Sequence, residues 1–109
     1  MIEFLLAANL VTYLNNPKYE VESCSVTPFE LVTVTDPMWP TDTFELEGEV
    51  NLRAYVDSAG TVISSDIVTS TPLRIFDRAA KRALAKWKFN KSEANERCFN
   101  VKFKFELSD

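Results

Sequence analysis

Few residues of this chain have the type and spacing that chemistry needs. Three carboxylates alternate at Glu45, Glu47 and Glu49, where they could bind a calcium ion or form a solvated strand edge. No glycine-turned acidic loop accompanies them, which favours the solvated edge. The chain has no histidine, and its two glycines exclude a glycine-rich phosphate loop. The sequence therefore predicts no catalytic residue, no metal site and no cofactor, so an enzyme is not expected.

The two cysteines, Cys24 and Cys98, are the other reactive side chains. Their wide separation along the chain excludes a CxxC redox or zinc motif. Two interpretations stay open. The cysteines are either buried free thiols or, if the protein is exported to an oxidising compartment, a disulfide.

Charge is distributed unevenly along the chain. Residues 1–49 hold nine acids and one base, whereas residues 50–109 hold eleven bases and seven acids. Six bases lie in or beside a predicted helix over residues 76–89, on its non-core face: Arg74, Arg78, Lys81, Arg82, Lys86 and Lys88. This face is either simply solvated or a docking surface for an acidic partner. Nucleic acid is not expected as a partner, because the whole chain carries a net charge of −4 and has no recognisable binding motif.

The helix that carries these bases is predicted by an apolar stripe with helical period. The stripe consists of Phe76, Ala79, Ala80, Ala83, Leu84 and Trp87. Its alanines would let the helix backbone lie close to a sheet, with Trp87 as a core anchor. Ser70-Thr71-Pro72 has the composition of a helix entry, and Asn90 can close the helix.

Alternating apolar and polar residues predict strands on both sides of the helix. Residues 48–57 and 61–69 form a hairpin, with Gly60 at a positive φ angle and a bulge near Ile63 or Ser64. The last strand covers residues 99–107. The predicted fold class is α+β, an antiparallel sheet of three or four strands with one long helix packed on one face.

The chain divides into an N-terminal extension, residues 1–28, and a domain, residues 29–109. The apolar start is too short to span a membrane as a helix, and Glu3 with no nearby Lys or Arg argues against an intact signal peptide. We interpret it as a short helix ending before Pro17, followed by an irregular segment. A strand or the remnant of a trimmed export signal is the alternative.

Residues 29–107 carry an ordered series of motifs that resembles the TonB C-terminal domain family. The motifs are Leu31-Val32-Thr33-Val34, Pro37-Met38-Trp39-Pro40, Gly48-Glu49-Val50, Asp57-Ser58-Ala59-Gly60-Thr61-Val62, Ser70-Thr71-Pro72, the string Phe-Asp-x-Ala-Ala-x-x-Ala-x-x-x-Trp-x-Phe from residue 76, and the apolar strand Val101–Leu107. Their order and spacing together are specific, although no single motif is. Trp39 departs from the family, which usually has tyrosine there, and the stretch from Pro40 to Gly48 is shorter than usual.

This resemblance implies a periplasmic domain that binds outer-membrane TonB-dependent transporters, or another envelope protein, in an energy-transducing system. It also implies that the last strand is a free edge that accepts an extended peptide by strand addition. The expected partner-binding residues are Pro37, Met38, Trp39, Pro40, Phe99, Val101, Lys102 and Lys104. If a strand of the same chain closes that edge instead, residues 29–35 are its expected source.

Several alternatives stay open beside the transporter-binding hypothesis. A stand-alone periplasmic structural domain of the same fold would bind no transporter and could pair its free edge with a second copy, giving a homodimer. A ligand- or inhibitor-binding domain would share only the fold. The chain contains no transmembrane anchor and no proline-rich spacer, so we expect an excised domain of an inner-membrane-anchored protein or a soluble relative. Trp39 is either an interface anchor or a core residue.

Overall fold

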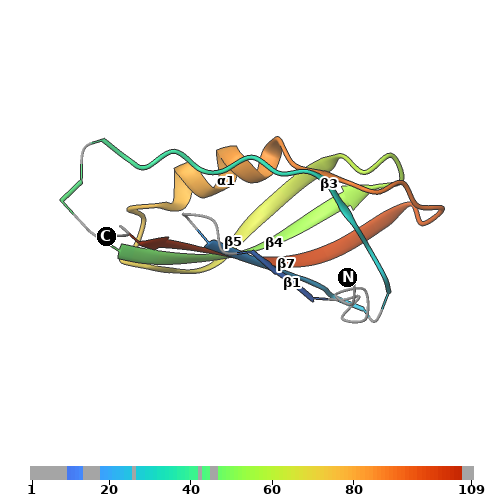
Figure 1. Cartoon of the computed structure of the whole chain (residues 1–109), viewed down its shortest axis with the longest axis horizontal. Coiled ribbons are helices and arrows are strands. Elements are labelled where there is room, and N and C mark those ends of the chain that lie inside the picture. Colours follow the sequence, from blue (N-terminus) through green and yellow to red (C-terminus); the bar gives the residue numbers. More distant parts are fainter. Residues whose placement is uncertain (1–9, 14–17, 26, 42, 45–46, 107–109) are drawn as a thin grey trace.

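The computed structural model describes residues 10–13, 18–25, 27–41, 43–44 and 47–106, and this part of the chain forms one helix and seven strands. Five strands make an antiparallel sheet in the spatial order β1-β2-β7-β4-β5. They are β1 (Leu10–Tyr13), β2 (Lys18–Ser23), β4 (Glu47–Asp57), β5 (Val62–Thr71) and β7 (Glu96–Glu106). The helix α1 (Asp77–Ala85) lies on one face of this sheet (Figure 1). The predicted α+β class is therefore confirmed, with a broader sheet than expected.

A second, two-stranded sheet lies on the same side as the helix. It pairs β3 (Leu31–Thr33) with β6 (Lys88–Phe89), which follows the helix almost directly. Residues 34–41, which follow β3, are extended and run alongside α1 (Figure 1). This arrangement places the Pro-x-Trp-Pro motif next to the helix.

Alternating side chains on three neighbouring strands build the floor of the core. The antiparallel register places Val21 of β2, Val101 of β7 and Leu52 of β4 in one row across the sheet, all buried. A period of two sends every second side chain to the same face, so the intervening polar residues point to solvent. The apolar residues that alternate in the sequence of these strands are thus the residues that point into the core.

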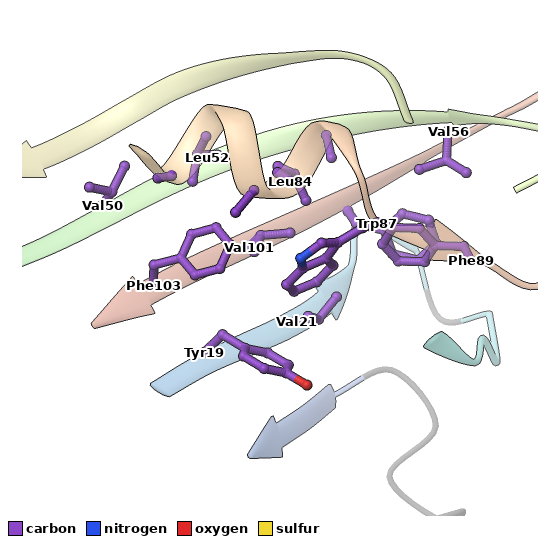
Figure 2. Packing of buried hydrophobic residues seen from close by; sticks show 14 of the residues in the cluster. Tyr19, Val21, Val50, Leu52, Val56, Leu84, Trp87, Phe89, Val101 and Phe103 are labelled. Atoms are coloured by element: carbon purple, nitrogen blue, oxygen red, sulfur yellow. The ribbon is translucent and has the colours of Figure 1, made fainter. Parts of the chain in front are cut away.

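Trp87 closes the core from the helix side. It is 1% exposed and lies between the end of α1 and the sheet, with Tyr19 of β2 and Phe103 of β7 against its ring (Figure 2). The ring centroids are 5.0 Å and 5.5 Å apart in edge-to-face geometry, an arrangement that aromatic quadrupoles favour. The prediction that Trp87 is a core anchor is confirmed.

The β4–β5 hairpin has the predicted turn. Gly60 has a φ angle of 92°, and the Asp57 carboxylate accepts hydrogen bonds from the backbone N–H groups of Ala59 and Thr61. The register shifts between Tyr55 and Val56, which leaves Ile63 as the extra residue of a bulge. The predicted bulge is confirmed, and a second shift leaves Val68 as another extra residue.

The helix begins later than its sequence motif suggests. Ser70 and Thr71 end strand β5, and Arg74 has a φ angle of 66°, which breaks any continuous helix from Pro72. The predicted helix entry at Ser70-Thr71-Pro72 is therefore wrong. Asn90 does not close the helix either: α1 ends at Ala85, and the Asn90 side chain accepts a hydrogen bond from the Glu30 backbone N–H.

The N-terminal segment contributes strands rather than the predicted helix and irregular run. Residues 10–13 form β1 and residues 18–23 form β2, while the rest of the predicted helix lies outside the described residues. Tyr19 and Val21 are buried in the core, so β2 is part of the same folding unit as residues 29–106. The reason is an alternation of apolar and charged residues in β2 that matches a strand with one buried face.

Candidate partner-binding site

The Pro-x-Trp-Pro motif divides its side chains between the core and the surface. Pro37 is buried, Met38 is 81% exposed, and Trp39 is half-buried. Two prolines hold this stretch extended, since each fixes its own φ angle and restricts the residue before it. The motif thus presents one apolar side chain fully to solvent.

Trp39 is held by two core phenylalanines. Its ring centroid lies 5.3 Å from that of Phe76 and 5.8 Å from that of Phe105, both edge-to-face. Phe76 and Phe105 stack on each other at 4.3 Å. The indole therefore packs on the core with one side and faces solvent with the rest, so both interpretations of Trp39 describe part of it.

Gly48 makes room for this aromatic cluster. A Cβ atom at Gly48 would overlap the Phe76 ring and lie 2.9 Å from the Thr71 carbonyl oxygen. Only a residue without a side chain lets Phe76 lie this close to β4. Gly48 therefore supports Trp39 indirectly, by setting the position of the ring beneath it.

A groove of about 900 Å³ separates the extended segment from α1. Pro37, Met38 and Trp39 lie on one wall, and Ile75, Ala79 and Ala83 on the helix side. Ala79 and Ala83 contribute only methyl groups to this side of the groove. An open surface groove can hold an extended peptide, whereas small-molecule sites enclose most of the surface of their ligand.

Four bases line the helix side of the groove. Among the described lining residues, Asp36 is the one acid, and it belongs to the extended segment. The bases are Arg74, Arg78, Arg82 and Lys86, all exposed. No described residue forms an ion pair with any of the four. The sequence identified these bases but not the segment that they face, because the path of residues 35–41 alongside the helix (Figure 1) has no local sequence signal.

The last strand is not the free edge that the sequence predicted. Strand β7 is paired with β4 on one side and with β2 on the other, in continuous register from Lys18↔Lys104 to Ser23↔Phe99. Residues 29–35 are not its neighbour either, since β3 pairs with β6. Period-two patterning identifies a strand and its buried face, but it does not say which strand lies beside it.

The four predicted binding residues of β7 are accordingly reassigned. Phe99 and Val101 are each 1% exposed and belong to the core, so they cannot contact a partner. Lys102 and Lys104 are half-buried on the opposite face, and the Lys102 ammonium lies 3.9 Å from the Glu49 carboxylate. The sheet edges in the described part of the chain are β1 and β5.

Cys24 and Cys98 are bonded to each other. Their Cα atoms are 5.3 Å apart, and the Cys24 backbone N–H donates to the Cys98 carbonyl at 3.0 Å. The sequence left open whether the two cysteines are free thiols or a disulfide, and in the structure they form a disulfide. The bond fixes the end of β2 against β7, where the free edge had been expected.

The structure offers little catalytic or metal-binding chemistry. In the described ranges no cluster of His, Cys, Asp and Glu side chains could hold a metal ion. Of the three alternating carboxylates, Glu49 accepts a hydrogen bond from the Asn51 side-chain amide, and Glu45 lies outside the described residues. Burial lowers the pKa of the Arg97 guanidinium, and the nearby Asp57 carboxylate acts in the opposite direction by raising this pKa. Arg97 donates to the backbone carbonyls of Asp57 and Asn90, so its role is to hold the loop before β7.

Together these features define a class of protein, a small α+β domain with a surface groove between an extended proline-containing segment and a basic helix. The sequence profile described as "Gram-negative bacterial TonB protein C-terminal" matches residues 44–107. The chain belongs to this family. Membership in this family confirms the expectation that the chain is not an enzyme.

Curated relatives and a solved structure agree with this assignment. Protein TonB of Xanthomonas campestris pv. campestris is 41% identical over 61 residues, which cover 54% of this chain and 27% of that protein. Protein TonB of Yersinia enterocolitica is 30% identical over 91 residues, 81% of this chain and 36% of that protein. The chain thus spans about a third or less of these relatives.

The solution NMR structure of the Pseudomonas aeruginosa TonB CTD has the same fold. Its TM-score is 0.64 at 23% identity, and the match covers 80% of this chain and 96% of that one. In the part of the chain that the structure describes, no helix is long and apolar enough to cross a membrane.

Proposed function

We propose that this chain is a periplasmic module that binds outer-membrane TonB-dependent transporters within an energy-transducing system. Family membership is the observation that carries the proposal. The disulfide between Cys24 and Cys98 supports the location, since structural disulfides persist in oxidising compartments such as the periplasm. The curated relatives are longer than this chain, and an inner-membrane anchor in the full-length protein would fit that difference.

The contact surface in this proposal is the Pro-x-Trp-Pro segment with the groove beside it. Met38 is exposed on a backbone stiffened by two prolines, so the backbone loses little conformational freedom when a partner covers this residue. Trp39 adds an aromatic surface already positioned by Phe76 and Phe105. Rigid apolar anchors of this kind carry much of the energy of protein interfaces.

The test is direct binding to a purified TonB-dependent transporter in detergent, measured by surface-immobilised titration. Met38→Glu places a charge on the exposed anchor and should weaken binding at least about tenfold, as for a central interface residue. Leu73→Glu is the matched control, because Leu73 is 76% exposed but does not line the groove. Equal affinity of the Met38→Glu variant and the unchanged chain would reject this surface.

A homodimer is the second candidate, favoured by the outer edge of β5. This edge strand exposes Ile63 and Val68, each 53% exposed, at its two bulges. Pairing with β5 of a second copy would cover both side chains and satisfy the edge N–H and C=O groups. Sedimentation velocity of the unchanged chain and of the Ile63→Lys variant, each over a range of concentrations, tests for this dimer. If the unchanged chain is a monomer at all concentrations, the dimer is excluded.

A further inference from the structure

The groove beside α1 combines unpaired positive charge with unpaired backbone groups. Arg78, Arg82 and Lys86 follow one another at four-residue intervals along the helix side. Successive bases are therefore about 6 Å apart along the helix axis. Among the described residues that line the groove, Asp36 is the one acid beside four bases, so their summed charge is positive although the whole chain is acidic.

The opposite wall offers hydrogen-bonding groups without partners. From Asp36 to Thr41 no backbone carbonyl is hydrogen-bonded within the described part of the chain, and neither are the N–H groups of the four residues other than Pro37 and Pro40, which have none. The segment is instead anchored just before this run, where the Trp87 indole N–H donates to the Thr35 carbonyl at 2.9 Å. A fixed, extended backbone with open donors and acceptors can pair with a second extended chain.

The spacing of the bases matches an extended chain. Side chains two residues apart on a strand lie on the same side and are separated by about 6.6 Å. Carboxylates at alternate positions would therefore meet Arg78, Arg82 and Lys86 in turn. The other side chains of such a peptide would point to the opposite face, where they would lie beside the exposed Met38 side chain of the paired segment.

We propose that this groove binds an extended peptide segment of a partner protein that carries acidic residues at alternate positions with apolar residues between them. The inference rests on the proposed function and deepens it, by stating the chemistry of the partner segment. A sulfated or phosphorylated polymer would satisfy the bases. It would leave the apolar wall and the open backbone groups unused, so the peptide is the occupant that the whole groove fits.

The test uses a fluorescein-labelled peptide, Thr-Glu-Val-Glu-Val-Glu-Thr, and the anisotropy of its fluorescence as the protein is added. A second peptide of the same composition, with its three glutamates adjacent, tests the spacing. We expect saturable binding that weakens in high salt, because exposed charges are screened. We also expect the alternating peptide to bind several-fold more tightly, and equal binding of the two peptides would overturn the proposal.

Matched charge reversals locate the binding surface. The double variant Arg78→Glu, Arg82→Glu should weaken binding about tenfold or more, because each reversal replaces an attraction by a repulsion. The control Lys81→Glu, Lys91→Glu changes net charge equally, and both its residues are exposed but outside the groove. Equal weakening in the two variants would show that net charge alone attracts the peptide.

Two further measurements keep the result decisive. If the reversed pair does not fold by circular dichroism, Arg78→Gln with Arg82→Gln removes the charges without repulsion. Displacement of the peptide by dextran sulfate at equal charge concentration would assign the groove to polyanions in general and overturn the proposal. No transporter is used, so failure of the transporter experiment and failure of this one are separate results.

Discussion

The indole N–H of Trp87 donates a 2.9 Å hydrogen bond to the carbonyl oxygen of Thr35, 52 positions earlier in the chain. The Trp87 ring is at the centre of the helix–sheet core, whereas Thr35 begins the extended segment that lines the groove. One side chain therefore connects the packing of the core to the position of the candidate binding surface.

Replacing Trp87 separates these two roles. Trp87→Phe keeps an aromatic ring in the core but removes the donor, and should cost about 1–2 kcal/mol of unfolding free energy from the lost bond and the void. Trp87→Ala should cost about 3–5 kcal/mol. Urea unfolding measures both. Trp39 is then the remaining tryptophan, so the emission of Trp87→Phe reports the surroundings of Trp39 alone. A Trp87→Ala variant as stable as the unchanged chain would contradict the placement.

Gly48 and Phe76 form a second connection between sheet and groove. Gly48→Ala should destabilise the protein by about 1–3 kcal/mol, because the new methyl group overlaps the Phe76 ring. A double-mutant cycle with Phe76→Ala tests the cause: the two changes should cost less together than the sum of their separate costs. Strict additivity in thermal unfolding would mean that the clash with Phe76 is not the reason.

The parts of the fold that sequence patterns predicted are those set by local periodicity. The helical stripe ending in Trp87, the alternation of β4 and β7, the Gly60 turn and the bulge at Ile63 each depend on residues close together in the chain. The same local patterns predicted a helix entry at Ser70-Thr71-Pro72, whereas α1 begins at Asp77. The positive φ angle of Arg74 could not be predicted, because arginine has no preference for this conformation.

Neighbour relations were not predictable in the same way. Lys102 and Lys104 were interpreted as charges that keep a free edge from aggregating, but strand β2 is paired with β7 along this edge. Alternation in Tyr19-Glu20-Val21-Glu22 was the available signal for β2, but Pro17 and Pro28 on either side favoured an irregular segment. The sequence identified the groove residues individually, but it could not predict that they lie together, because this depends on the path of residues 35–41.

Removing the disulfide should reveal how far it stabilises β2 on the sheet. Cys24→Ser with Cys98→Ser opens a long covalent loop, for which the chain-entropy model gives a loss of about 4 kcal/mol. Thermal unfolding of the variant, and of the unchanged chain with and without dithiothreitol, measures it. The variant should be insensitive to reductant. Mass spectrometry of unreduced protein that finds two freely alkylated thiols would contradict the bond.

Val21 tests whether β2 belongs to the core or is a detachable extension. It is fully buried in the row formed with Val101 and Leu52, whereas its neighbour Glu22 is exposed on the same strand. Val21→Ala removes two buried methyl groups and should lower the unfolding free energy by about 2 kcal/mol. Glu22→Ala is the control and should change it by less than about 0.5 kcal/mol, as for surface substitutions in general. Urea unfolding followed by circular dichroism measures both variants. If Val21→Ala unfolds at the same urea concentration as Glu22→Ala, β2 does not contribute to the core in solution, and the edge of β7 is open to a partner strand after all.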